Sequence, residues 1–212
     1  MPNTKPPITT TKLALEYRER ILDSLEDKDC GFVPLMTLYL TDNTTPEEIR
    51  KAHATGHIHA AKYYPAGATT NSDFGVSHLT KTYEALKAME EIGMVLAIHS
   101  EVSRPEIDIF DRETVFIDEV MVPLVRDFPN LKIVMEHIST KGAVDFVNQQ
   151  KGTNLRASIT AHHLLYNRNG ETNHVQYLLS TFLLNHFSPG SYHAHESIGT
   201  TLHVDSDPSR WY

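Results

Sequence analysis

The amino-acid sequence predicts an α/β fold, specifically a partial (β/α)8 barrel with about five parallel strands. One lysine and two histidines, Lys62, His99 and His137, recur at near-equal intervals of 37 and 38 residues, about the length of a strand–helix–strand repeat. Each belongs to an apolar, strand-like run: 57–65, 94–101 and 131–139. Parallel neighbouring strands would bring these side chains to one rim, where barrel enzymes place their chemistry. No G-x-G-x-x-G follows any strand, so a dinucleotide-binding fold has no support.

The N-terminal third already shows this alternation. Residues 1–10 are rich in proline and threonine and predict a loop, whereas residues 11–26 carry apolar side chains at helical spacing. The continuously apolar run 31–40 is typical of a strand covered on both faces. Thr45-Pro46-Glu47-Glu48 combines an N-cap, a proline at the first helical position and a glutamate three residues after the cap. It predicts a helix that ends near Gly56.

Further helices and a strand continue the pattern. Between the second and third strands, the polar loop 66–77 is expected to be a mobile lid, and the helix after it ends at Gly93, a typical helix-stop residue. Three further helices are predicted, at 78–91, 113–127 and 140–150. The fifth strand is predicted at 155–164. After Asn169 the alternation stops. We therefore expect a partial barrel over residues 1–169 and a divergent, weakly structured tail over 170–212.

Composition excludes several classes of protein. Of 212 residues, 40% are hydrophobic and 22% charged, which is ordinary for a globular protein. The net charge of −8, without a basic cluster, argues against nucleic-acid binding. No apolar run approaches the roughly 20 residues of a membrane span. The single cysteine, Cys30, excludes an internal disulfide and fits a reducing compartment, so a cytoplasmic location is predicted.

Lys62, His99 and His137 together predict one side of a binuclear metal site. Imidazoles suit zinc. A buried lysine has a lowered pKa, and its neutral amine can react with CO₂ to form a carbamate that bridges two metal ions. Two such ions can polarise a carbonyl group, which is the chemistry of amide hydrolysis. Structural histidines and a solvated lysine are the alternative interpretation, and the repeat spacing leaves the two about equally weighted.

Four other polar residues are weaker candidates. The His162-His163 pair follows the fifth strand and is more typical of supporting or structural histidines than of ligands. Asp108 and Asp111 could bind a metal, but their charged loop is more typical of a cap for the next helix.

Several motifs together give the sequence a specific resemblance. It resembles the dihydroorotases of the single-function bacterial and fungal type, within the amidohydrolase superfamily. The matching motifs cover residues 1–169 in order: MPN at 1–3, PPITT at 6–10, AKYYPAGATTN at 61–71, IHSEV at 98–102, DIFDRE at 108–113, EHISTK at 136–141 and ITAHHLLYNRN at 159–169.

The resemblance implies a (β/α)8 barrel around two zinc ions bridged by a carboxylated lysine, which Lys62 matches. His99 and His137 match further metal ligands. Asn3 matches an asparagine that holds the substrate carboxylate, and Thr69 and Thr70 match the tip of a loop that closes over the substrate. The implied reaction is the reversible cyclisation of N-carbamoyl-L-aspartate to L-dihydroorotate in pyrimidine biosynthesis.

The departures from the family pattern are equally specific. The family's H-x-H pair and substrate-binding arginine have no counterpart, and neither has its metal-bound, proton-shuttling aspartate in G-T-D-S-A-P-H. Asp205 echoes that aspartate only faintly, so no catalytic proton-transfer residue is identified. Smaller departures are Ser100, where glycine is usual, and Ala161-His162, where Pro-Gln is common.

These departures predict a truncated chain with little or no activity alone. The alternative is a non-catalytic dihydroorotase-derived chain that acts only by association, as a homodimer or with a full-length enzyme. A hydantoinase-like hydrolase of the same superfamily is a third hypothesis, against which MPN, the Thr69-Thr70 loop and DIFDRE argue.

Overall fold

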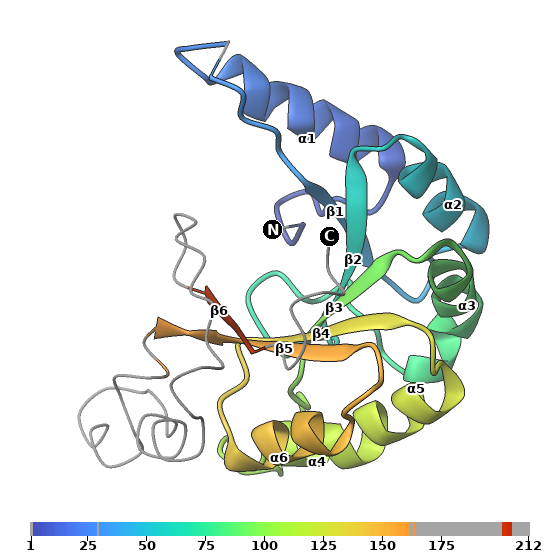
Figure 1. The fold of residues 1–212 in the computed structure, drawn as a ribbon, viewed down its shortest axis with the longest axis vertical. Coiled ribbons are helices and arrows are strands. Elements are labelled where there is room, and N and C mark those ends of the chain that lie inside the picture. The colour runs from blue at the N-terminus through green and yellow to red at the C-terminus, as the bar shows by residue number, and fades with distance from the viewer. Residues whose placement is uncertain (1, 29, 162, 164–200, 205–212) are drawn as a thin grey trace. The chain divides into compact units, whose positions relative to one another are not determined.

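A computed structural model describes residues 2–28, 30–161, 163 and 201–204. The chain forms two compact units. Of the described residues, the first unit contains those within Met1–His99 and Arg126–Lys132, and the second contains those within Ser100–Val125 and Ile133–Tyr212. Strands alternate with helices along the described chain, as the sequence predicts (Figure 1).

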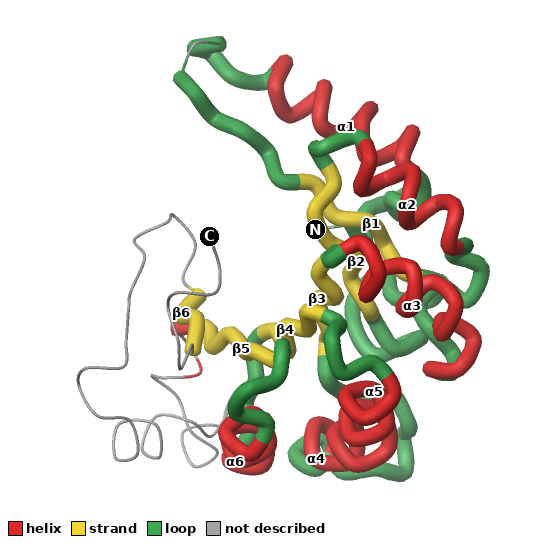
Figure 2. Tube along the Cα trace, turned by 45° about the vertical axis from the view of Figure 1, so that its right-hand side comes forward, coloured by secondary structure: helices red, strands yellow, loops and turns green. Residues whose placement is uncertain are grey.

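The first unit is built on three parallel strands. These are β1 (Met36–Leu40), β2 (Ile58–Tyr63) and β3 (Val95–His99), which pair in that order. Figure 2 shows their helices on one side of the strands: α1 (Thr11–Asp23), α2 (Pro46–Ala54) and α3 (Tyr83–Ile92), with the 3-10 turn η1 (Leu79–Thr82) before α3. The core between these layers is aliphatic and includes Leu38, Leu40, Ile49, Leu86, Met89 and Leu96.

The second unit repeats the same plan. Strands β4 (Lys132–Glu136) and β5 (Leu155–Thr160) are parallel, and β6 (Thr201–Val204) pairs with β5 in the antiparallel direction. The helices of this part of the chain are α4 (Arg112–Phe116), the π-helical turn η2 (Ile117–Met121), α5 (Val122–Asp127) and α6 (Lys141–Gln149). No helix among the described residues is long and apolar enough to cross a membrane.

The helix boundaries follow from their capping residues. The Thr45 hydroxyl accepts a hydrogen bond from the Glu48 amide at 3.2 Å and starts α2, as predicted. Gly93 ends α3 with φ of +71°, a left-handed conformation that glycine adopts without strain. Thr140 starts α6 in the way that Thr45 starts α2.

Three predicted elements differ from the structure. The predicted strand 155–164 is a strand only as far as Thr160, where β5 ends. The predicted strand 31–40 is a strand only from Met36, because Pro34 has no amide hydrogen to donate to a neighbouring strand. Phe32, Val33 and Leu35 are instead exposed. The predicted helix 113–127 is interrupted by the π-helical turn η2, which side-chain spacing alone does not indicate. Of the predicted tail, the structure describes only β6; the boundary near residue 169 lies outside the described residues.

Backbone atoms pack closely around Gly75, at the base of the loop after β2. A methyl group there would lie 2.4 Å from the Tyr64 carbonyl oxygen and 2.9 Å from that of Ser72, and both oxygens belong to the backbone. We expect Gly75→Ala to lower the free energy of unfolding by roughly 1–3 kcal/mol in urea denaturation. Gly142→Ala is the control: it meets nothing closer than 3.6 Å within α6 and should stabilise by roughly 0.5–1 kcal/mol. Equal effects of the two substitutions would contradict this packing.

Candidate active site

Lys62 is a buried lysine in the middle of the first unit's strands. Its side chain lies on β2, between Tyr39 of β1 and Ala97 of β3 in the strand register, and only 3% of the residue is exposed. Its Nζ lies 5.2 Å from the centre of the Tyr64 ring, which is cation–π distance. A lysine is almost never this buried without a specific partner, so Lys62 is not the solvated charge of the alternative interpretation.

His99 ends β3 and lies near the same tyrosine. Its ring is half-buried and lies 6.3 Å from the Tyr64 ring, centre to centre. The Tyr39 ring packs against Tyr64 at 5.3 Å, and Tyr64 itself is 2% exposed. Tyr64 is therefore the side chain that the two candidate metal ligands of this unit share.

Asn3 reaches this cluster because the N-terminal segment docks on β1. The Tyr39 amide donates to the Ile8 carbonyl oxygen at 2.8 Å. The Asn3 Oδ1 accepts from the Tyr64 hydroxyl at 3.1 Å, and its Nδ2 donates to the Thr70 carbonyl oxygen at 2.9 Å. The Asn3 amide thus joins Tyr64 to the tip of the loop 66–77.

That loop is held by its own hydrogen bonds. The fully buried Ser72 accepts from the Thr69 amide at 2.9 Å and donates to the Thr69 carbonyl oxygen at 2.6 Å. Asn71 donates from Nδ2 to the Asn3 carbonyl oxygen at 3.0 Å. Thr69 is half-buried and Thr70 exposed, and of these two predicted loop-tip residues Thr70 contacts Asn3, through its carbonyl oxygen.

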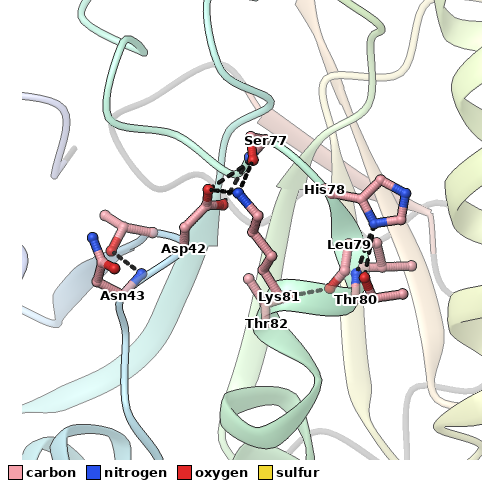
Figure 3. A network of polar contacts seen from close by, with 9 residues as sticks. Asp42, Asn43, Ser77, His78, Leu79, Thr80, Lys81 and Thr82 are labelled. Atoms are coloured by element: carbon pink, nitrogen blue, oxygen red, sulfur yellow. Dashed lines mark hydrogen bonds and ion pairs between the residues drawn. The ribbon is translucent and has the colours of Figure 1, made fainter.

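Asp42 fastens the far end of the loop to the segment after β1. Its carboxylate accepts from the Ser77 amide at 2.8 Å, the Ser77 hydroxyl at 2.7 Å and the Lys81 ammonium at 2.8 Å (Figure 3). Burial opposes the charge, but these hydrogen bonds outweigh it and lower the pKa of Asp42. The loop is therefore attached at its tip and at its end.

Burial keeps the Tyr39 hydroxyl protonated. Burial is the main cause that raises the pKa of Tyr39 to about 12, and the negative charge of Asp73 is the second cause. The hydroxyl therefore stays a donor, and it donates to the Asn71 carbonyl oxygen at 3.2 Å. This hydrogen bond is a second link between β1 and the loop.

His137, the third predicted ligand, belongs to the second unit and follows β4 directly. It has a φ of +47°, a left-handed conformation that costs a non-glycine residue roughly 1–2 kcal/mol. Its amide donates to the Ser158 hydroxyl at 3.0 Å, and the next amide, of Ile138, donates to the Ser158 carbonyl oxygen at 2.9 Å. The Ser139 amide donates to both carboxylate oxygens of Glu113 at 3.1 Å.

Glu113 is a buried carboxyl group, 5% exposed, at the start of α4. Burial raises its pKa to about 7, and the nearby charge of Glu101 adds to the rise, while hydrogen bonds from Thr140 and Ser139 oppose it. Neither Glu113 nor Tyr64 was singled out from the sequence. Glu113 resembles an ordinary charge at a helix start, and Tyr64 an ordinary strand residue; their only sequence signal is membership of the motifs DIFDRE and AKYYPAGATTN.

The weaker candidates divide into two groups. Asp108 and Asp111 are exposed, and the Asp108 Oδ1 accepts from the Phe110 amide at 2.9 Å, so Asp108 shapes the turn before α4. His163 is buried. His162 and Asp205 lie outside the described residues. Within the described part of the chain, no group of three or more His, Cys, Asp or Glu residues lies close enough together to hold a metal ion.

Comparison with solved structures confirms the predicted fold class. A dihydroorotase from Saccharomyces cerevisiae in complex with 5-fluoroorotic acid matches with a TM-score of 0.73 and 32% identity, over 82% of this chain and 50% of that chain. The dihydroorotase of Campylobacter jejuni matches with a TM-score of 0.70 and 35% identity, over 80% and 48%. An L-hydantoinase from Arthrobacter aurescens, 18% identical with a TM-score of 0.66, shares the fold. The fold is thus part of an amidohydrolase-type (β/α)8 barrel.

Curated relatives confirm the resemblance at the level of sequence. Dihydroorotases of Aliivibrio fischeri strain MJ11 and Vibrio cholerae are 63% and 62% identical over 169 residues, which is 80% of this chain and 48% of each relative. Over that stretch the chain is a homologue of the dihydroorotases. It spans about half the length of the curated relatives it matches. No family model matches the chain.

Tyr64→Phe tests the link between the lysine cluster and Asn3. The substitution keeps the ring against Tyr39 and removes only the hydroxyl that donates to Asn3. We expect the free energy of unfolding to fall by about 1 kcal/mol, the usual net value of one hydrogen bond, in urea denaturation. Tyr17→Phe, on the half-buried face of α1, is the matched control and should change it by less than about 0.5 kcal/mol. An unchanged midpoint for Tyr64→Phe would show that the hydrogen bond carries no stability.

The raised pKa of Glu113 predicts a pH-dependent stability. The folded state holds this proton more tightly than the unfolded state, whose pKa is near 4.5. Protonation therefore stabilises the fold below about pH 4.5, and that contribution is lost as the pH rises through 7. Without metal, we expect unfolding free energies of the parent chain and Glu113→Gln to diverge between pH 5 and 8, by roughly 3 kcal/mol at most, with the parent losing more. Parallel pH profiles would contradict the assignment.

Proposed function

We propose that this chain carries part of a dihydroorotase active site and takes part in the reversible cyclisation of N-carbamoyl-L-aspartate to L-dihydroorotate, in the cytoplasm and in pyrimidine biosynthesis. The observation that carries this proposal is the homology to dihydroorotases over four-fifths of the chain, combined with a buried Lys62 at the position of the matching motif. A cyclic amide hydrolase needs a means to polarise an amide carbonyl, and the candidate residues suit a metal that does so.

The donor set fits zinc. His99 and His137 offer imidazole nitrogens, and both residues are half-buried. Lys62 is 3% exposed, and burial of a lysine favours the neutral amine that a carbamate requires. We propose that these three residues hold two zinc ions, with Lys62 carboxylated. Zinc bound in this way would supply Lewis-acid polarisation of the amide and lower the pKa of water.

In the proposed site, the protein's own polar groups bind and orient the substrate. Hydrogen bonds to the Tyr64 hydroxyl and the Thr70 carbonyl oxygen orient the Asn3 amide, so its Nδ2 is fixed at the loop tip. We propose that it binds the substrate carboxylate there, with Thr69 and Thr70 beside it. None of the described residues is assigned the proton transfer, whose loss typically costs roughly 10²–10⁴ in rate.

Ring opening of dihydroorotate by the purified chain tests this function. With zinc and bicarbonate present, we expect a rate at least roughly 10²-fold below that of the full-length Vibrio cholerae relative. Lys62→Ala should abolish that residual turnover, whereas Lys87→Ala, an exposed lysine on α3, should leave it unchanged.

Two outcomes would contradict the proposal. Turnover that Lys62→Ala does not reduce would remove Lys62 from the site. No turnover from a folded sample at any zinc concentration would favour the non-catalytic interpretation, in which the chain acts by association with a copy of itself or with a full-length enzyme.

A further inference from the structure

The turn that follows β4, residues 137–140, is held from two sides. We call it the His137 turn. On one side, Ser158 of β5 accepts from two successive amides, those of His137 and Ile138. On the other side, Glu113 of α4 accepts from the next amide, that of Ser139. Three consecutive backbone donors are therefore bonded to groups outside the turn.

This arrangement explains how His137 keeps a strained conformation. A positive φ at a non-glycine residue persists only where the surrounding contacts over-determine the backbone. The first two hydrogen bonds fix the backbone on the β5 side of His137. Without the third, the chain between His137 and α6 could relax, since the cap of α6 is Thr140, three residues later. Glu113 closes this set of contacts.

A carboxylate is an expensive way to hold one backbone turn. Burying Glu113 to 5% exposure costs desolvation, and Glu101 adds like charge nearby. A neutral side chain could cap the same turn at lower cost. The cost is understandable where geometry matters more than stability, as it does for the residues that orient a metal ligand.

We propose that Glu113 is a positioning residue for metal binding: its carboxylate holds the His137 turn so that the His137 imidazole is presented to the metal. This inference rests on the proposed function, because it requires His137 to be a ligand. Glu113 accepts hydrogen bonds from the Ser139 amide and from Thr140, which both belong to the turn, so its carboxylate acts on His137 through the turn.

The expected effect is on zinc affinity. Residues that orient a metal ligand typically contribute 10–100-fold to metal affinity. Glu113→Gln keeps the shape of the side chain but sets an amide donor against the donors of the turn. We expect it to raise the zinc dissociation constant of the full chain roughly 10–100-fold, measured by competition with a fluorescent chelator at pH 7.5. The matched control is Glu119→Gln, which removes the same charge from an exposed ion pair with Arg104 and should leave the constant unchanged.

A double-mutant cycle separates positioning from a general loss of structure. In a His137→Ala background, Glu113→Gln should change the zinc dissociation constant by less than about twofold, because the ligand that it positions is gone. Circular dichroism spectra and unfolding midpoints of all variants show whether the chain is folded. Ser158→Ala removes the hydroxyl that accepts from the His137 amide and keeps the carbonyl oxygen that accepts from the Ile138 amide. It should reproduce the loss of affinity through a separate contact.

The outcomes distinguish this inference from the proposed function. An equal effect of Glu113→Gln in both backgrounds, or none in the parent chain, would overturn the positioning role and leave His137 as a ligand. A zinc dissociation constant that His137→Ala itself does not change would instead remove His137 from the metal site, and the proposed function with it.

Discussion

The burial of Lys62 is the constraint on which the first unit depends. Parallel pairing places Lys62 between Tyr39 and Ala97, where its amine cannot reach bulk water. A charged amine in that position needs a partner, and the Tyr64 ring supplies one at 5.2 Å. The same tyrosine fixes Asn3 through its hydroxyl and contacts His99 through its ring. Tyr64 thus contacts both candidate ligands of this unit, Lys62 and His99, and it contacts the loop tip through Asn3.

The second unit meets the same requirement with different means. Its candidate ligand follows a strand instead of lying within one, so no strand register holds it. Backbone hydrogen bonds to Ser158 and Glu113 hold the backbone around His137 instead, and they stabilise its positive φ. Both solutions place polar groups in the interior with defined contacts, Lys62 with the Tyr64 ring and Glu113 and Ser158 with backbone amides, and these contacts make the geometry specific.

Much of this could be predicted from the sequence, and the exceptions have physical reasons. Helices with caps were predicted well, because Thr45-Pro46 and Gly93 act locally. The predicted start of β1 was wrong, because the apolar side chains of Phe32 and Val33 indicate a buried strand only where a neighbouring strand covers them. Lys62 and His99 were singled out by their repeat spacing, and the structure places both against Tyr64. Tyr64 and Glu113 were not, since their roles arise from contacts with residues 61 and 26 positions away, Asn3 and Ser139.

The Tyr64 ring also constrains the chemical state of Lys62. An aromatic face attracts a cation and repels an anion, so this contact taken by itself favours the ammonium form. Desolvation acts in the opposite direction and favours the neutral amine. A carbamate on Lys62 would carry negative charge toward the same ring face, and it would be stable only with compensating positive charge beside it. Carboxylation of Lys62 and metal binding are therefore expected to occur together, and bicarbonate without zinc should leave the lysine unmodified.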